Sequence, residues 1–270
     1  KKGTGWLKAK TAIAAAANAH LGEHANVEVG WVRKVGEGLY RDVYASPVEG
    51  GAATNRVELS DVALVPSWDA PRETDERVRR EVALLRRLAE TDLPFRVPGW
   101  AEAVEESGHT ILVRDYVDGF PLDLFYGSRI GVKPWQVTGT IAAAVHATPT
   151  DALKAFVPVH GTRLAHAEAC LAEVAEITGE PVADDAVAWI RAHLPPEDSS
   201  CLVHGDLLPQ NILLDIENPP ALIDWEYSCL GDPAYDHAIA TRGSKRPFKQ
   251  RDGLARFLES YNGAADQELR

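Results

Sequence analysis

The chain has 270 residues, of which 45% are hydrophobic and 25% charged, and it carries a formal net charge of −12 at pH 7. This composition indicates a globular protein with a sizeable core, and the acidity disfavours binding to the phosphate backbone of nucleic acids. No apolar run is long enough to cross a membrane, and the three cysteines are too scattered for a disulfide framework. We therefore expect a cytoplasmic protein, monomeric or homodimeric, that binds neither nucleic acid nor membrane.

The first part of the chain is predicted to be rich in strands. An alanine-rich run follows four lysines near the start, but polar residues interrupt it, which favours a short helix over residues 8–21 rather than a secretory signal. A longer helical pattern follows, and a strand-length apolar run closes at Asp118-Gly119. The expected strands lie at 27–34, 39–45, 57–66 and 111–117, and the long helix lies at 74–90.

The second part is predicted to be mainly helical. Helical periodicity marks residues 135–147, 164–177 and 182–193, and it resumes after Asp232. Strand signals return only briefly, at 201–203, 211–214 and 221–225. This change from strand patterns to helix patterns predicts an α+β fold, with a strand-rich N-terminal lobe at 1–117 and a helical C-terminal lobe at 118–270.

Polar residues with catalytic potential cluster around the short strands of the second part. The strand at 201–203 delivers His204-Gly205-Asp206 into a loop, and Asn211 opens the next strand. Asp224 lies near the end of the strand at 221–225, and a hairpin of these two later strands would bring Asn211 and Asp224 toward Asp206. Carboxylate and amide oxygens suit Mg²⁺, and one carboxylate would remain to handle an acceptor hydroxyl.

Three motifs in order resemble the aminoglycoside phosphotransferase family, whose members share a two-lobed, protein-kinase-like fold with choline kinases. These motifs are His204 to Asn211, Ile223 to Glu226, and Gly231 to Asp236. The resemblance covers residues 35–261. It implies that the chain transfers the γ-phosphate of ATP, with Mg²⁺ as cofactor, to a hydroxyl of a small molecule.

The resemblance also implies roles for the motif residues. Asp206 would be the catalytic carboxylate that orients and deprotonates the acceptor hydroxyl, while Asn211 and Asp224 would hold Mg²⁺. The alternative for both aspartates is a turn or cap residue. Three further residues would support the loop without touching substrate: His204, Asp232 and Asp236.

Glu81 is a candidate for the nucleotide site. It lies on the apolar stripe of the helix at 74–90, where a carboxylate needs a partner, and the family pairs the matching glutamate with a strand lysine. We predict a cation within about 4 Å of Glu81; the alternative is that Glu81 reaches out to water. The strand departs from the family pattern, because Leu64 stands where the lysine is expected. Possible substitutes are Arg56, Lys34 and Arg72.

Two backbone segments are further candidates for nucleotide binding. Gly36-Glu37-Gly38 lies between two strands and could cover the phosphates with its N–H groups, or could be an ordinary hairpin turn. The resemblance places the adenine site at the backbone of Asp115, Tyr116 and Val117, with the Asp115 side chain facing solvent.

The identity of the acceptor and two rival functions stay open. The first 117 residues have a formal charge of −2 and the rest −10, which is compatible with an amine-bearing acceptor; the alternative is an acidic surface that serves solubility. Aminoglycosides, macrolides, choline-like amino alcohols and sugars are the candidates. The rivals are a nucleotide-binding pseudokinase or scaffold, motivated by Leu64, and a metal-dependent hydrolase that uses Asp206, Asp224 and His204.

The remaining histidines look unremarkable in the sequence. His146 lies on an apolar helix and is expected to be a core histidine with its hydrogen bonds satisfied. His160, His166 and His193 do not have the spacing of metal ligands.

Overall fold

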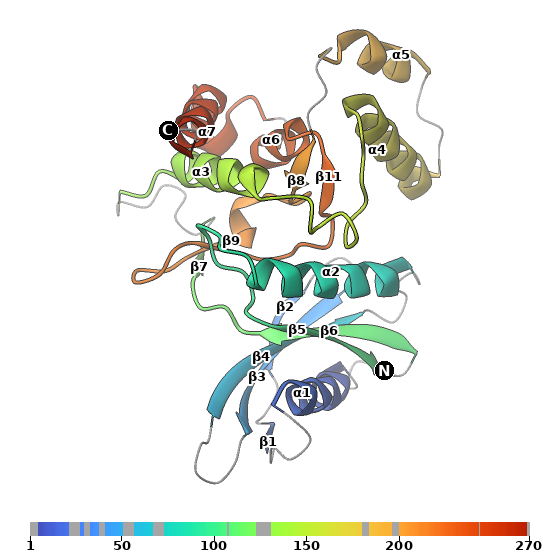
Figure 1. Ribbon diagram of the computed structural model, residues 1–270, viewed down its shortest axis with the longest axis vertical. Helices are drawn as coiled ribbons and strands as arrows, with labels where there is room; N and C mark the ends of the chain where they lie inside the picture. Colours follow the sequence, from blue (N-terminus) through green and yellow to red (C-terminus); the bar gives the residue numbers. More distant parts are fainter. Residues whose placement is uncertain are drawn as a thin grey trace. The chain divides into compact units, whose positions relative to one another are not determined.

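The computed structural model describes most of the chain (Figure 1). Its contacts divide the chain into two compact units. The first unit comprises Lys1–Asp92, Arg96–Gly119 and Asp215–Glu226, and the second comprises Leu93–Phe95, Phe120–Leu214 and Tyr227–Arg270. The described residues are 5–21, 28–29, 33–37, 41–50, 57–66, 73–106, 108–122, 131–179, 184–195, 200–242 and 244–268.

The first unit is built around an antiparallel sheet. Its strands follow the order β1-β3-β4-β6-β5, and β2 pairs with β3. The expected strand at 57–66 is confirmed as β4, which pairs with β3 along its whole length. The strands are β1 (Glu28–Val29), β2 (Arg33–Glu37), β3 (Arg41–Gly50), β4 (Val57–Pro66), β5 (Ala101–Glu106) and β6 (His109–Asp115).

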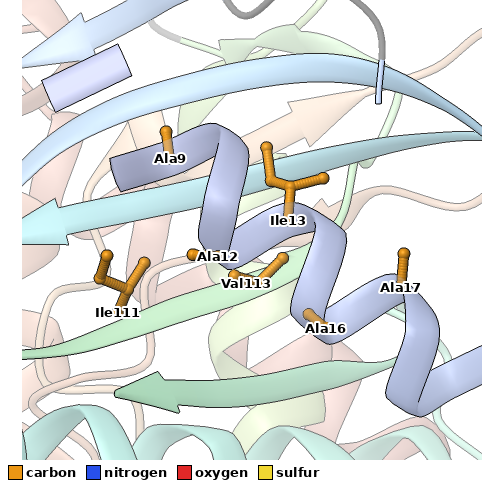
Figure 2. Close-up of a cluster of buried hydrophobic side chains, with 7 residues drawn as sticks. All are labelled: Ala9, Ala12, Ile13, Ala16, Ala17, Ile111 and Val113. Carbon is orange, nitrogen blue, oxygen red and sulfur yellow. The ribbon is translucent and has the colours of Figure 1, made fainter. Parts of the chain in front are cut away.

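Helix α1 (Gly5–Leu21) packs on one face of this sheet. Figure 2 shows Ala12 and Ala16 of this helix beside Val113 of β6. Ile111 and Val113 alternate along β6 and therefore share a face. Because alanine adds only a methyl group, the helix backbone can lie close to the strands. The buried alanines and isoleucine of this cluster are Ala9, Ala12, Ile13, Ala16 and Ala17.

Helix α2 (Glu73–Ala89) packs against β5 and β6. Its buried face repeats at intervals of three and four residues, which confirms the apolar stripe expected from the sequence. One member of that stripe is the carboxylate Glu81. The others are Val78, Val82, Leu84, Leu85 and Leu88.

The first unit also contains Asp215–Glu226, although the sequence order suggested the helical lobe for this segment. Arg96 explains the difference. Its backbone N–H donates to the carbonyl of Pro220 and its carbonyl accepts from Leu222, so it forms a parallel bridge with β10 (Ala221–Leu222). Its guanidinium donates to the Pro219 carbonyl and pairs with Asp215 at 3.3 Å.

The second unit is mainly helical, as expected. Helix α3 packs along α7, and α4 contacts α5. This unit also contains short strands: β8 pairs with β11, and β7 pairs with β9, both antiparallel. None of the described helices is long and apolar enough to cross a membrane. The elements are β7 (Phe120–Pro121), α3 (Pro134–Ala147), α4 (Arg163–Thr178), α5 (Asp184–His193), β8 (Cys201–Val203), η2 (Pro209–Asn211), β9 (Ile212–Leu214), β11 (Cys229–Gly231), α6 (Ala234–Thr241), η3 (Pro247–Lys249) and α7 (Gly253–Glu268).

Candidate active site

The loop after β8 places Asp206 and Asn211 in direct contact. The Nδ2 of Asn211 donates to the backbone carbonyl of Asp206 at 2.9 Å and to its Oδ2 at 2.8 Å. The backbone N–H of Asp206 donates to Nδ1 of His204, which is fully buried. The carboxylate of Asp206 is therefore held in one orientation, and Asn211 turns its amide nitrogen toward it.

Asp236 holds the backbone of this loop through hydrogen bonds. Its buried carboxylate accepts the backbone N–H groups of His204 at 2.8 Å and Gly205 at 2.9 Å, and it lies 3.1 Å from Nε2 of His146. Burial alone would raise the pKa of Asp236, but the hydrogen bond from His146 and the one from the His204 backbone hold this pKa below its ordinary value. The carboxylate thus stays ionised and anchors two successive peptide groups.

Gly205 is required by the shape of the loop. Its φ is +84°, a left-handed conformation that side chains disfavour. A Cβ at this position would also lie 2.2 Å from the backbone carbonyl oxygen of Tyr227. The Gly in the His-Gly-Asp motif therefore allows the chain to turn between His204 and Asp206.

Asp232 makes contacts that stabilise the surrounding structure. Its Oδ1 accepts the backbone N–H of Ala234 at the start of α6 and forms an ion pair with Arg163. These contacts fix the end of β11 to the beginnings of α4 and α6. The residue is 9% exposed, so this pair lies in a largely water-free environment.

In the first unit, Glu81 holds the backbone next to Asp224. Its Oε1 accepts the N–H of Trp225 at 3.2 Å, and Glu81 is only 3% exposed. The alternative in which Glu81 reaches water is therefore wrong. Its cationic partner stays a prediction; the candidates are Lys34 in β2 and two arginines outside the described residues, Arg56 and Arg72.

The backbone at Asp224 also departs from the expected strand. We predicted a strand over 221–225, but β10 ends at Leu222 and Asp224 has φ +71°. Trp225 holds this turn because its indole N–H donates to the Leu222 carbonyl while its side chain is buried. A strained conformation of this kind persists only where the surroundings enforce it, and Glu81 and Trp225 do so here.

The expected nucleotide segments are described only in part. Gly36 lies in β2 opposite Val43, where the pairing with β3 is irregular, and Gly38 lies outside the described residues. Leu64 lies in β4 between Val43 and Leu112 of the neighbouring strands. Of the three substitutes suggested for the lysine, Lys34 lies in β2, and Arg56 and Arg72 fall outside the described part of the chain.

The segment Asp115 to Val117 follows β6, as expected. The Asp115 side chain is only partly exposed: its Oδ1 accepts the backbone N–H of Trp100, and burial raises the pKa of the carboxyl group. Tyr116 is exposed and Val117 is buried. An adenine site on this backbone stays a prediction.

His160, His166 and Cys229 converge in the second unit, which their spacing did not suggest. Their candidate ligand atoms lie within 4.8 Å of one another, and Cys229 Sγ is 3.6 Å from His166 Nε2. However, the Asp232 N–H donates to His166 Nδ1 at 2.9 Å, so the neutral ring carries its proton on Nε2. A metal would need that Nε2 lone pair. The cluster is therefore a hydrogen-bonded part of the core.

The fold is of the protein-kinase-like type that phosphotransferases of known structure share. The model of the phosphotransferase enzyme family matches residues 45–269, and the chain belongs to that family. A macrolide 2'-phosphotransferase from Brachybacterium faecium is 20% identical with a TM-score of 0.61, covering 94% of this chain and 82% of that one. A streptomycin–ATP complex of APH(2")-IIa is 16% identical with a TM-score of 0.60, covering 94% and 86%.

One curated relative matches a short stretch of the chain. Acyl-CoA dehydrogenase family member 10 of Mus musculus is 38% identical over 68 residues, which are 24% of this chain and 6% of that protein. The match therefore spans a small part of a much longer polypeptide.

Proposed function

We propose that Asp206 is the residue that receives the proton of an acceptor hydroxyl as the γ-phosphate of ATP is transferred to it. The observation that carries this role is the hydrogen bond from Asn211 Nδ2 to Asp206 Oδ2. It orients a partly exposed carboxylate at the end of a rigid loop, and positioning is the main contribution a protein makes to phosphoryl transfer. Asp236, His204 and Asp232 support the loop and do not contact substrate in this proposal.

Asn211 and Asp224 are the residues that we propose as ligands of Mg²⁺. Since Asn211 directs its amide nitrogen at Asp206, its Oδ1 is the atom suited to a cation, and the carboxylate of Asp224 would be the second protein ligand. When bound, Mg²⁺ neutralises charge on the transferred phosphoryl group. Glu81 would act on this site indirectly, because it fixes the peptide that follows Asp224.

ATP would be held by backbone groups of the first unit. We propose that Gly36 and Gly38 cover the phosphates and that the backbone of Asp115 to Val117 binds adenine. Glu81 completes this set through its predicted cationic partner. We place the reaction in the cytoplasm and expect a monomer or a homodimer; the three cysteines are free thiols, which is compatible with a reducing compartment.

Substitution of the two aspartates separates their roles. Asp206→Ala should lower kcat by about 100-fold or more while leaving Mg-ATP affinity nearly unchanged, because only the proton acceptor is lost. Asp224→Ala should instead weaken Mg-ATP binding. Coupled ADP release and calorimetric titration measure the two effects. The exposed Asp151 supplies a matched control, Asp151→Asn, which should behave as wild type. Wild-type turnover by Asp206→Ala would refute the assignment.

The acceptor is proposed to carry a protonated amine beside its hydroxyl group. Kanamycin, streptomycin and hygromycin B occur in complexes of structurally similar phosphotransferases. An acceptor screen by ADP release should therefore contain kanamycin, erythromycin, choline and glucose. Nucleotide binding without ADP release for any acceptor would favour the pseudokinase.

A further inference from the structure

Three side chains from three helices form a hydrogen-bonded chain that the proposed roles leave unexplained. The hydroxyl of Tyr261 on α7 is 3.0 Å from Nδ1 of His146 on α3. Nε2 of His146 is 3.1 Å from Oδ2 of Asp236 on α6. The side chains of His146 and Asp236 are 5% and 0% exposed, so bulk water does not compete for these hydrogen bonds.

The donor and acceptor capacities of these three side chains determine where the protons lie. The ionised carboxylate of Asp236 can only accept, so Nε2 of His146 carries a proton and donates it. When the ring carries only this proton, Nδ1 presents a lone pair, which accepts the O–H of Tyr261. Burial raises the pKa of Tyr261 to about 12, so this hydroxyl remains a donor at neutral pH. The tautomer of His146 is thus set from both sides.

A close approach of two helices places Tyr261 at this point. Gly139 lies two turns before His146 on α3, and a Cβ there would be 2.7 Å from the carbonyl oxygen of Phe257 and 3.0 Å from the backbone nitrogen of Tyr261. The Tyr261 ring also packs edge-on against His237, with centroids 4.5 Å apart. Helix α7 is therefore held where its tyrosine reaches His146.

We propose that Tyr261 is a positioning residue for phosphoryl transfer, which acts through His146 and Asp236 on the His204–Gly205 backbone. Without the hydroxyl, the imidazole could take its other tautomer, and its Nε2 lone pair would then face the carboxylate of Asp236. The two peptide groups that Asp236 holds would become less ordered, and Asp206 follows them directly in the chain. The effect on turnover rests on the proposed role of Asp206; the effect on the loop does not.

Amide hydrogen exchange of His204 and Gly205 tests the effect on the loop. Tyr261→Phe should raise the exchange rate of these two amides by about 2- to 10-fold, the range expected for one lost hydrogen bond. Tyr235→Phe, which removes another half-buried tyrosine hydroxyl from the same unit, should leave the rate unchanged. Equal rates in wild type and Tyr261→Phe, or equal increases in both variants, would overturn the proposal.

Substitutions at His146 test the route of the effect. His146→Gln keeps an amide donor for Asp236 but loses the acceptor that faces Tyr261, whereas His146→Leu loses both. We expect exchange close to wild type in His146→Gln and faster exchange in His146→Leu. Adding Tyr261→Phe to His146→Gln should then change nothing further. An additive increase in the double variant would show that Tyr261 does not act through His146.

Turnover separates this inference from the proposed function. With Mg-ATP alone and water as the acceptor, Tyr261→Phe should lower kcat for ADP release by about 2- to 10-fold and leave the KM for ATP unchanged. Asp206→Ala is measured in parallel. Wild-type turnover in Asp206→Ala would refute the role of Asp206 while the exchange result stands. An inactive Asp206→Ala together with wild-type exchange in Tyr261→Phe would refute the inference alone.

Discussion

His237 shows how burial at one residue makes stability depend on pH. It packs against His146, Phe257 and Tyr261, and burial lowers its pKa to about 4. A histidine in the unfolded chain titrates near 6.5, so between about pH 4 and 6.5 the unfolded chain binds more protons than the folded one. The free energy of unfolding should therefore fall as the pH is lowered through this window.

Replacing this histidine by a side chain that does not titrate should weaken the dependence. His237→Gln should reduce the slope of unfolding free energy against pH by less than about 1.4 kcal/mol per pH unit, because the side chain is only partly buried. Urea denaturation at several pH values measures the slope. His160 and His166, whose pKa values burial also lowers, should contribute in the same direction. The same slope in both proteins would show that His237 does not contribute.

The sequence could predict candidate catalytic residues that lie close together in the chain, because a motif records local spacing. Asp206 and Asn211 are five residues apart and make the contact that the motif implied. Tyr261 and His146 are 115 residues apart, and the sequence alone predicted only a satisfied core histidine. No spacing rule connects such residues, since the packing of α7 on α3 creates their contact.

At the scale of secondary-structure elements, α1 depends on small side chains. Ala16 belongs to the cluster with Ile111 and Val113 (Figure 2) and is 1% exposed, whereas the neighbouring Ala15 is exposed. Ala16→Leu should lower the free energy of unfolding by about 1–3 kcal/mol, because the larger side chain must separate helix and sheet. Ala15→Leu makes the same chemical change on the solvent side and should have little effect. Equal losses in the two variants would contradict this packing.

Periodic elements were easier to predict than strained ones. The helical pattern at 74–90 corresponds to α2 within one residue at each end, because a buried stripe repeats along it. The strand predicted at 221–225 ends early, because Asp224 adopts a left-handed backbone conformation, which is uncommon for residues other than glycine. That conformation depends on Glu81, which lies 144 residues from Trp225 in the chain.

At the scale of the whole molecule, the asymmetry of charge should influence encounter with the acceptor. Residues 118–270 have a formal charge of −10, against −2 for residues 1–117. The field of such a surface attracts cations, and salt screens it over a Debye length of about 10 Å at 0.1 M. If kanamycin is an acceptor, its kcat/KM should fall several-fold between low and physiological salt. Glucose should show no such fall, and salt-independent turnover of kanamycin would refute the electrostatic argument.

The division into a strand-rich and a helical part was visible in the sequence, because each part has its own hydrophobic period. The membership of Asp215–Glu226 was not visible. Arg96 and Pro219 are 123 residues apart in the chain. Their contact accompanies the backbone bridge between Arg96 and Ala221, which cannot be predicted from the composition of either segment.

That assignment has a consequence for biosynthesis. Because β10 and Asp224 belong to the first unit, this unit remains incomplete until residue 226 has left the ribosome, by which time most of the second unit has also been synthesised. The two units therefore cannot mature strictly one after the other, as successive domains do during translation. A nascent chain stopped at residue 119 would contain the strands of the sheet and both of its helices. It would lack β10, so the backbone of Arg96 could not form its hydrogen bonds with Pro220 and Leu222.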